Sequence, residues 1–250
     1  MKKLFLTTGV VLAATVSFAQ SNNDLTEQYG NGNSASVLQM GMDNDNHVYQ
    51  VGDGNIAETT QEGVENINLT VSVGDFNEAY VDQLGWANDN YTDQDGDGNV
   101  AYVDQDGIFN VNIQDQNGND NYAETTQSGD SNYTTQFQDG DWNLASSSQA
   151  GTANSASQTQ YGLDNWAFTT QSGSNNMSIQ YQSGDVNTMY ATQSGDNNYI
   201  DQWQVGDFNY ANDQQFGSDN YSFITQSGES HSHVGLQFGN SNSMVVTQSN

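Results

Sequence analysis

Polar and apolar positions along the chain recur every eleven residues, a period that fits neither one helix nor one alternating strand. The stretch QSGDNNYIDQWQVGDFN, residues 193–209, contains the pattern twice, because Gln193, Gly195 and Asn198 are followed eleven residues later by the same three residue types. A polar chain of this kind would by composition alone be assigned to low-complexity disorder. Disorder requires no fixed period, so the spacing predicts a repeated structural unit.

The repeat extends over the chain from residue 22 onward. Steps of eleven from Gln28 to Gln248 give 21 positions, of which 20 are Gln and one is Ser72. The series from Gly30 to Gly239 has Gly at all 20 positions, and the series from 33 to 242 has Asn at 19 of 20. We therefore expect a single repeat array over residues 20–250, with no separate domain or linker.

Each unit is predicted to consist of one strand and one turn. Seven residues, such as 198–204, suit a strand, and the following four, 205–208, suit a tight turn in which Gly supplies unusual dihedrals. Side chains alternate between the two faces of a strand, so Asn, the residues two and four positions later, and Gln point the same way. We expect that face to form the interior.

The interior positions also show a longer period of 22 residues. Ala recurs at 35, 57, 79, 101, 123, 145 and 167, whereas the alternate units carry Asn46, Asn68, Asn90 and Asn112. Stacked coils of two strands and two turns would select this pattern. The predicted fold is all-β: a two-sheet, cross-β β-solenoid with 22 residues per coil and about ten coils, forming a rod of about 50 Å.

Stacked Gln and Asn side chains can hydrogen-bond along such a rod, as in amyloid ladders, so a polar interior is satisfied. The predicted core ladder comprises Gln50, Asn55, Ala57, Gln61, Asn66, Ala79, Gln83, Asn88, Gln94, Asn99, Ala101, Gln105, Asn110, Gln114, Gln136, Gln158, Gln180 and Gln202. The predicted turn glycines include Gly52, Gly63, Gly74, Gly85, Gly96, Gly107 and Gly118.

The N-terminus has the features of a secretory signal. Lys2 and Lys3 precede the apolar run LFLTTGVVLAATV, which closes on Ser17-Phe18-Ala19, so residues 1–19 are predicted to be a removable signal peptide. The alternative is a transmembrane anchor, which the shortness of the run disfavours. A secreted protein leaves the cell, so we expect an extracellular location.

Composition restricts the partners. The chain has 31 acidic residues and no basic residue beyond Lys2 and Lys3, so cleavage would leave a formal charge of −31. Such a surface repels nucleic acid and anionic lipid, and neither nucleic-acid binding nor membrane insertion is expected, whereas divalent cations are attracted. Without Cys there are no disulfides, and nothing suggests an enzyme or a bound cofactor.

The pattern Gln-x-Gly-x-x-Asn-x-Ala-x-x-x-Gln, seen from Gln50 through Gly52, Asn55 and Ala57 to Gln61, resembles the curlin repeat of curli fibre subunits. The resemblance covers nearly all of the chain after residue 20. It implies an extracellular functional amyloid of a Gram-negative bacterium, exported unfolded through an outer-membrane pore, assisted by a nucleator subunit, and used in biofilm matrix and surface adhesion. This chain departs from the family in having Asn where Ser usually begins the first strand, and in having more repeats.

The sequence also predicts self-association. No cap is evident at either end of the array, and an open edge strand is a template for another chain. Head-to-tail stacking is a heterologous contact that does not close, so it yields a filament. We expect a homopolymeric fibre subunit; the alternative is a monomeric extracellular β-solenoid that binds ligands as a calcium-dependent adhesive or ice-binding module.

One of the two turns carries an acidic column in the position after Gly. The acidic members are Asp53, Asp75, Asp97, Asp141, Asp185, Asp207 and Glu229. Carboxylates one coil apart repel by up to about 1 kcal/mol in water. The column is therefore either a restraint on premature assembly that acid or divalent cations release, or a solvated edge that only maintains solubility.

Two local patterns suggest metals. The segment 93–104, DQDGDGNVAYVD, has the acidic spacing of an EF-hand loop, but the strand period continues on both sides, so flanking helices are not expected; a looser turn-bound calcium stays open. His231 and His233 share one strand face and could hold a transition metal. No third ligand is evident, which favours a degenerate terminal coil.

Outward positions place aromatic residues one coil apart: Tyr80 with Tyr102, Tyr199 with Tyr221, and Tyr181 with Trp203. Such stacks would support bundling or adhesion, or they reflect only the β-propensity of aromatic residues. An ice-binding face would require a regular Thr array. The outward column of Thr60, Thr126, Thr170 and Thr192 is interrupted by Asp82, Asp104 and Ser148, which disfavours ice binding.

Overall fold

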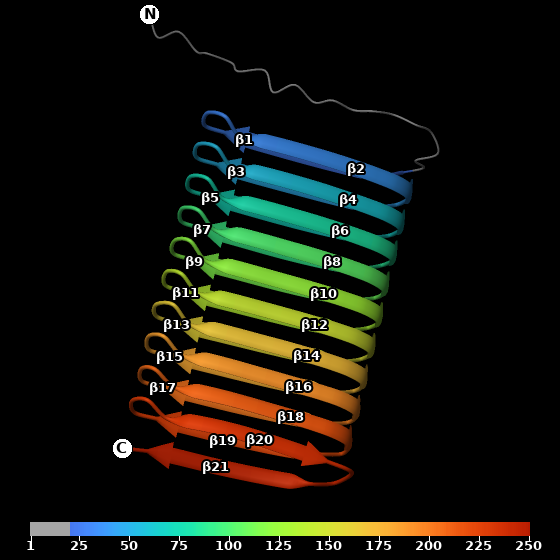
Figure 1. The fold of residues 1–250 in the computed structure, drawn as a ribbon. Coiled ribbons are helices and arrows are strands. Elements are labelled where there is room, and N and C mark those ends of the chain that lie inside the picture. The colour runs from blue at the N-terminus through green and yellow to red at the C-terminus, as the bar shows by residue number, and fades with distance from the viewer. Residues whose placement is uncertain (1–20) are drawn as a thin grey trace, which may run out of the picture.

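The computed structural model describes residues 21–250, and the predicted signal peptide at residues 1–19 lies outside this part of the chain. The described chain winds into a flattened rod whose coils stack one above the next (Figure 1). Two parallel β-sheets form the long sides, and no described residue is helical. The predicted two-sheet β-solenoid with 22 residues per coil is confirmed.

The first sheet contains eleven strands, each of seven residues. In spatial order these are β1 (Asn23–Tyr29), β3 (Asp45–Val51), β5 (Ile67–Val73), β7 (Asp89–Asp95), β9 (Val111–Asn117), β11 (Tyr133–Asp139), β13 (Ser155–Tyr161), β15 (Met177–Ser183), β17 (Tyr199–Val205), β19 (Tyr221–Ser227) and β21 (Ser243–Ser249).

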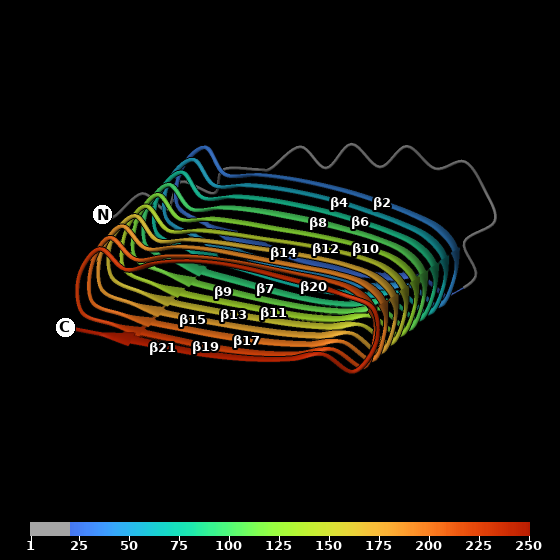
Figure 2. The ribbon, with the colours of Figure 1, turned by 60° about the horizontal axis from the view of Figure 1, so that its bottom comes forward.

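The second sheet contains ten strands, and all but the last have nine residues. They are β2 (Ser34–Met42), β4 (Ile56–Val64), β6 (Glu78–Trp86), β8 (Val100–Ile108), β10 (Tyr122–Asp130), β12 (Leu144–Thr152), β14 (Trp166–Ser174), β16 (Thr188–Asp196), β18 (Tyr210–Ser218) and β20 (Ser232–Phe238). Figure 2 shows the two sheets facing each other, joined by a turn at each edge.

Strand pairing is parallel and in register throughout. Each residue lies beside the residue 22 positions later, so that Gln105 pairs with Gln127 and Ala101 with Ala123. This register places identical residue types in columns along the rod, which is the arrangement that the 22-residue period predicted.

The predicted boundary between strand and turn was wrong in two respects. Asn immediately precedes every strand except β20, which follows His231, and does not begin it: β17 starts at Tyr199, one residue after Asn198. In the second sheet all strands except β20 continue through the turn glycine, as β4 does through Gly63 to Val64. The turn backbone also bonds between coils, with Glu65 N donating to Met42 O at 3.0 Å, so pairing extends into the turn.

The interior between the sheets is narrow and mostly polar. Its walls are Asn, Gln, Ala, Thr and Ser side chains that face inward at alternate strand positions. Within residues 21–250, a larger apolar cluster forms near the C-terminal end, where Met189, Ala211 and Ile224 pack with Met244 and Val246. Most of the rod is therefore stabilised by hydrogen bonds along its axis and by close packing of small side chains.

Candidate functional site

Amide ladders run along the interior of the rod. All of the predicted core ladder residues are at most 2% exposed. In the two Gln columns next to the turns, Nε2 donates to the Oε1 of the Gln one coil later, for example Gln105 to Gln127 at 2.9 Å, except where Ser72 interrupts one column and its hydroxyl donates to Gln94 Oε1 at 3.0 Å. The same amide also donates to a backbone carbonyl, Asp89 O, at 3.0 Å. Both amide hydrogens are thus satisfied without water.

A third ladder ends at an ionisable pair of one buried and one partly buried side chain. It runs through Gln114, Gln136, Gln158, Gln180 and Gln202, with amide contacts of 2.8 to 2.9 Å between successive members.

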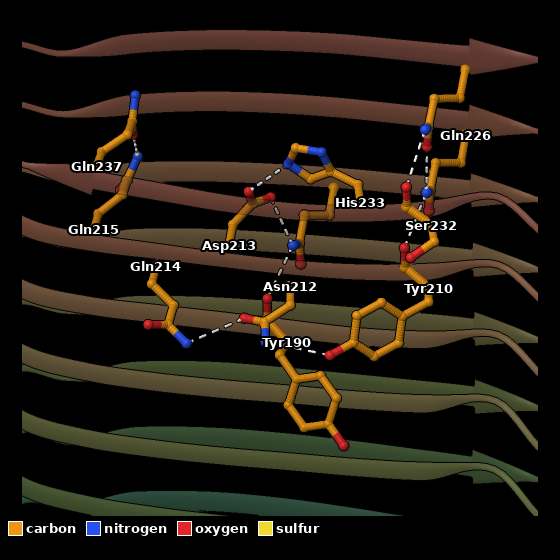
Figure 3. A network of polar contacts seen from close by, with 12 residues as sticks. Tyr190, Tyr210, Asn212, Asp213, Gln214, Gln215, Gln226, Ser232, His233 and Gln237 are labelled. Carbon is orange, nitrogen blue, oxygen red and sulfur yellow. Dashed lines mark hydrogen bonds and ion pairs between the residues drawn. The ribbon is translucent and has the colours of Figure 1, made fainter.

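Ile224 follows Gln202 in that column, and Asp213, on β18 of the facing sheet, is fully buried and accepts from the last Gln of the ladder. Its Oδ2 accepts from Gln202 Nε2 at 2.9 Å, and its Oδ1 lies 3.0 Å from His233 Nε2 (Figure 3). Sequence reasoning missed this carboxylate, although the column of Thr125, Ser147, Thr169 and Ala191 leads directly to it. His233 therefore has an acidic partner inside the rod.

The turn glycines occupy a conformation and a space that other residues cannot share. Gly52 has φ of +121°, and a Cβ built there would overlap the carbonyl oxygen of Gly74 in the next coil. The other predicted turn glycines, Gly63, Gly74, Gly85, Gly96, Gly107 and Gly118, also have positive φ and equally close carbonyl neighbours. Glycine is required at these positions because neighbouring coils approach to backbone contact.

The acidic turn column binds backbone amides. Asp75 Oδ1 accepts from Asp53 N at 2.7 Å, and Asp97 Oδ1 accepts from Asp75 N at 2.8 Å. Asn119 Oδ1 accepts from Asp97 N in the same way, at 3.0 Å. The bond requires an oxygen acceptor and not a charge, which explains why Asn replaces Asp here.

Three further acidic members of the column also accept hydrogen bonds from backbone amides. Asp141, Asp185 and Asp207 accept from the amides of Asn119, Leu163 and Asp185. At the last coil, Glu229 N donates to Asn250 Oδ1 at 3.2 Å. The sequence predicted the repulsion between these carboxylates but not the hydrogen bonds that position them.

A groove of about 450 Å³ lies on the outer face of the second sheet, over β4, β6, β8 and β10. Tyr80 and Tyr102 line it with stacked rings, their centroids 4.8 Å apart and their planes 8° apart. Asp82 and Asp104 lie beside them on the same face and are paired in register. The groove thus combines a flat aromatic surface with negative charge.

Burial and neighbouring negative charges raise the pKa values of acidic groups in this groove. Burial raises the pKa of Asp82, and the carboxylates of Glu62 and Asp106 raise it further. Burial likewise raises the pKa of Asp104, with Asp82 and Asp106 adding to the effect. Burial and a hydrogen bond to Glu78 raise the pKa of the Tyr80 hydroxyl to about 12. In this patch the charged carboxylates are therefore destabilised relative to water.

The predicted aromatic pairs are stacked. Ring centroids lie 5.2 Å apart for Tyr199 and Tyr221, and 4.7 Å apart for Tyr181 and Trp203. Two further stacks that the sequence analysis did not single out are Phe168 with Tyr190 and Phe216 with Phe238. Aromatic stacking therefore recurs on the outer faces of both sheets.

The metal patterns do not assemble into a site within residues 21–250. Asp93 and Asp95 lie on β7 and Asp104 on β8, in different sheets and without helices, so the segment is not an EF-hand. His231 Nε2 contacts Ser227 O, while His233 contacts Asp213. No group of three His, Asp or Glu side chains in this part of the chain is placed to hold a metal ion.

Each end of the rod presents strands that pair on one side only: β1 and β2 at one end, β20 and β21 at the other. The ladders have a direction. Gln28 and Gln39 donate into the rod, and among the described residues nothing donates to their own Oε1 atoms. At the opposite end, Gln237 and Gln248 accept from the preceding coil, and each donates one amide hydrogen to a backbone carbonyl. The second amide hydrogen of each has no acceptor among the described residues. One end therefore offers acceptors and the other donors.

No model of a protein family matches the chain, and no curated protein matches it. Within residues 21–250 there is no helix whose length and hydrophobicity would let it cross a membrane. The fold itself is consistent with a repetitive structural or adhesive module.

Proposed function

We propose that this chain is the secreted structural subunit of a curli-like functional amyloid fibre, which grows head to tail through the open ends of the solenoid. The observation that carries the proposal is the complementarity of the two ends. Unpaired strands of both sheets lie at each end, and the Gln ladders terminate in acceptors at one end and donors at the other. A second copy can continue both of the Gln ladders that reach the ends of the rod without changing their direction.

The chemistry of the rod supports a fibre over a closed oligomer. The contact joins different surfaces of each copy and so does not close on itself. The curlin-like spacing of the repeat, from Gln50 through Gly52 and Asn55 to Gln61, suggests the setting. In that setting the fibre contributes to biofilm matrix and surface adhesion outside a Gram-negative cell, with a nucleator subunit and an outer-membrane export pore as partners.

The test is assembly of the purified chain. Residues 20–250 are diluted from denaturant and followed by thioflavin fluorescence and negative-stain microscopy, with and without sonicated seeds. We expect seedable unbranched fibres with a strand spacing of about 4.8 Å along the axis. A chain that folds but stays monomeric at high concentration would refute the fibre proposal.

A second candidate is a monomeric extracellular binding module, and the groove over β4 to β10 favours it. Stacked Tyr80 and Tyr102 beside Asp82 and Asp104 form a surface suited to flat or cationic ligands. The two functions are separable, because a monomeric module would bind such ligands without forming fibres.

A further inference from the structure

The two sheets of the rod differ by one strand. The first sheet runs from β1 to β21 and has eleven strands, whereas the second runs from β2 to β20 and has ten. The described chain therefore contains an odd number of strand units and ends half a coil beyond its last complete coil (Figure 1). A second copy that docks on this end meets β20 and β21 at different heights.

The two turns of a coil share a positive φ at the turn glycine and at the residue two places later. In one turn Gly74 has φ of +117° and Phe76 has +58°; in the other Gly63 has +127° and Glu65 has +58°. A unit of one sheet therefore resembles a unit of the other in its turn, although most strands of the second sheet continue two residues further. Rotation by half a turn about the rod axis, with a rise of half a coil, brings a unit of one sheet to the place of a unit of the other.

We infer that successive copies in the fibre are rotated by half a turn about the fibre axis, so that β1 of the next copy pairs with β20 and β2 pairs with β21. This inference rests on the proposed head-to-tail assembly. Stacking without rotation would pair β1 with β21 and leave a space one strand wide between β20 and β2. The backbone groups bordering that space would have no partner in either copy.

Interior side chains match in the rotated arrangement. Continuing the observed register places Met244 opposite Ala35 of the next copy and Val246 opposite Val37. Both pairs are apolar, and they extend the apolar cluster that Met244 and Val246 already join. Apolar side chains therefore face each other in both pairs of the contact.

The unrotated arrangement gives a poorer match. The same register would then place Met244 opposite Asp24 and Val246 opposite Thr26. Asp24 Oδ1 already accepts from Asn46 Nδ2 at 2.7 Å, so its carboxylate faces inward. Enclosing that carboxylate beside a thioether removes it from water without a new donor, which is unfavourable.

The second half of the rotated contact pairs β20 with β1. His233 then faces Asp24, which places an imidazole next to the carboxylate. On the outer face Phe238 lies opposite Tyr29, and both side chains are exposed in the single chain. One column changes residue type at this contact, because His231 faces Asn22. Polar and aromatic complementarity thus favour the same rotation as the strand count.

Cysteine cross-linking tests the rotation directly, since the natural chain has no Cys. Val234 and Leu25 face outward and lie opposite each other only after the half turn, so fibres of a Val234→Cys, Leu25→Cys variant are expected to oxidise into covalent multimers. The matched control is Val245→Cys with Leu25→Cys, which are opposite only without rotation. The exposed fractions of Val234 and Val245 are similar, at 69% and 65%.

Image analysis of the same fibres gives a second readout. The rotated arrangement predicts one subunit per about 50 Å, which is 21 steps of about 2.4 Å, with a half turn between subunits beyond the twist of the sheets. The unrotated arrangement predicts about 53 Å and no half turn. Multimers from the Val245 variant, or fibres in which neither variant cross-links, would overturn the rotation and leave the fibre proposal intact. A failure to form fibres would refute the proposed function itself.

Discussion

At the scale of single residues, the fold depends on positions where the backbone adopts a left-handed conformation. The residue two places after each turn glycine has positive φ, and Gly32, Gly54 and Gly98 suit it. Elsewhere the same position holds side chains that disfavour this region, including Phe76 and the β-branched Val186, which has φ of +58°. These turns carry local strain that the coil stacking maintains.

Replacing Val186 with Gly is expected to stabilise the protein by about 1 kcal/mol, because it removes the cost of a β-branched residue at positive φ. Val186 is 39% exposed, so little packing is lost. The reciprocal control is Gly32→Val, at φ of +70°, where nothing crowds a Cβ and only the conformational cost is introduced. Urea unfolding measures both. Equal stability of the two variants would contradict this account.

Charge and hydrogen bonding can be separated at Asp75. Asp75→Asn retains an oxygen that can accept from Asp53 N, as Asn119 does for Asp97, and removes one charge from the column. We expect unchanged or slightly higher stability, and faster fibre growth if the column restrains assembly. Asp75→Ala removes the acceptor as well and is expected to cost about 1 kcal/mol. Unfolding midpoints and thioflavin lag times distinguish the two effects.

At the scale of the strand and its column, the interior ladders make each Gln dependent on its neighbours. Gln116 accepts from Gln94 at 3.0 Å and donates to Gln138 at 3.0 Å and to Val100 O at 3.1 Å. Gln116→Ala leaves several buried amide groups without partners, and the expected loss of stability is about 2 to 4 kcal/mol. Thermal or urea unfolding measures it. Outward Tyr91→Ala on β7 is the control, with a smaller expected loss.

The groove on the outer face links stability to pH. Because burial and neighbouring carboxylates raise the pKa of Asp82 and Asp104, the folded state binds their protons more tightly than the unfolded chain does. Their contribution to stability is fully present below the ordinary carboxyl pKa of about 4 and is lost as the pH rises through the raised values.

Asp82→Asn is therefore expected to raise the urea midpoint at neutral pH. In the wild type the midpoint rises as the pH falls from neutral to about 4.5, and this rise is expected to be smaller in the variant. The exposed Asp164 provides a matched control, since it lies outside the groove. A variant whose midpoint changes with pH as the wild type does would show that Asp82 does not contribute to the dependence.

At the scale of the whole molecule, each coil contacts only its neighbours, so entire coils are interchangeable modules. Deletion of residues 111–132 removes one coil of 22 residues and joins Asn110 to Tyr133 in register. We expect a folded rod that is shorter by about 4.8 Å, measurable by small-angle scattering. Deletion of residues 111–121 is the control. It moves every later unit to the opposite sheet, misaligns the interior columns, and is expected to destabilise the fold far more.

Much of this architecture could be predicted from the sequence because each unit repeats the same residue pattern. The 11-residue spacing of Gln, Gly and Asn predicted the strands and turns, and the 22-residue alternation of Ala with Asn predicted two sheets. Strand ends were less predictable, since Gly63 continues pairing into the turn. The partners of Asp75 and Asp213 depend on side-chain conformation and on which atoms meet between coils. A repeat pattern indicates that such residues lie in columns but not what they bind.

The in-register stacking of the coils also determines how the rod would respond to a pulling force. No disulfide joins the coils, and the bonds between them run parallel to the long axis. Tension applied to one end of the chain would therefore detach one coil at a time. Each event would release 22 residues, a gain of about 70 Å in contour length against about 4.8 Å of rod. A filament of such subunits would yield in small, repeated steps and absorb energy before breaking.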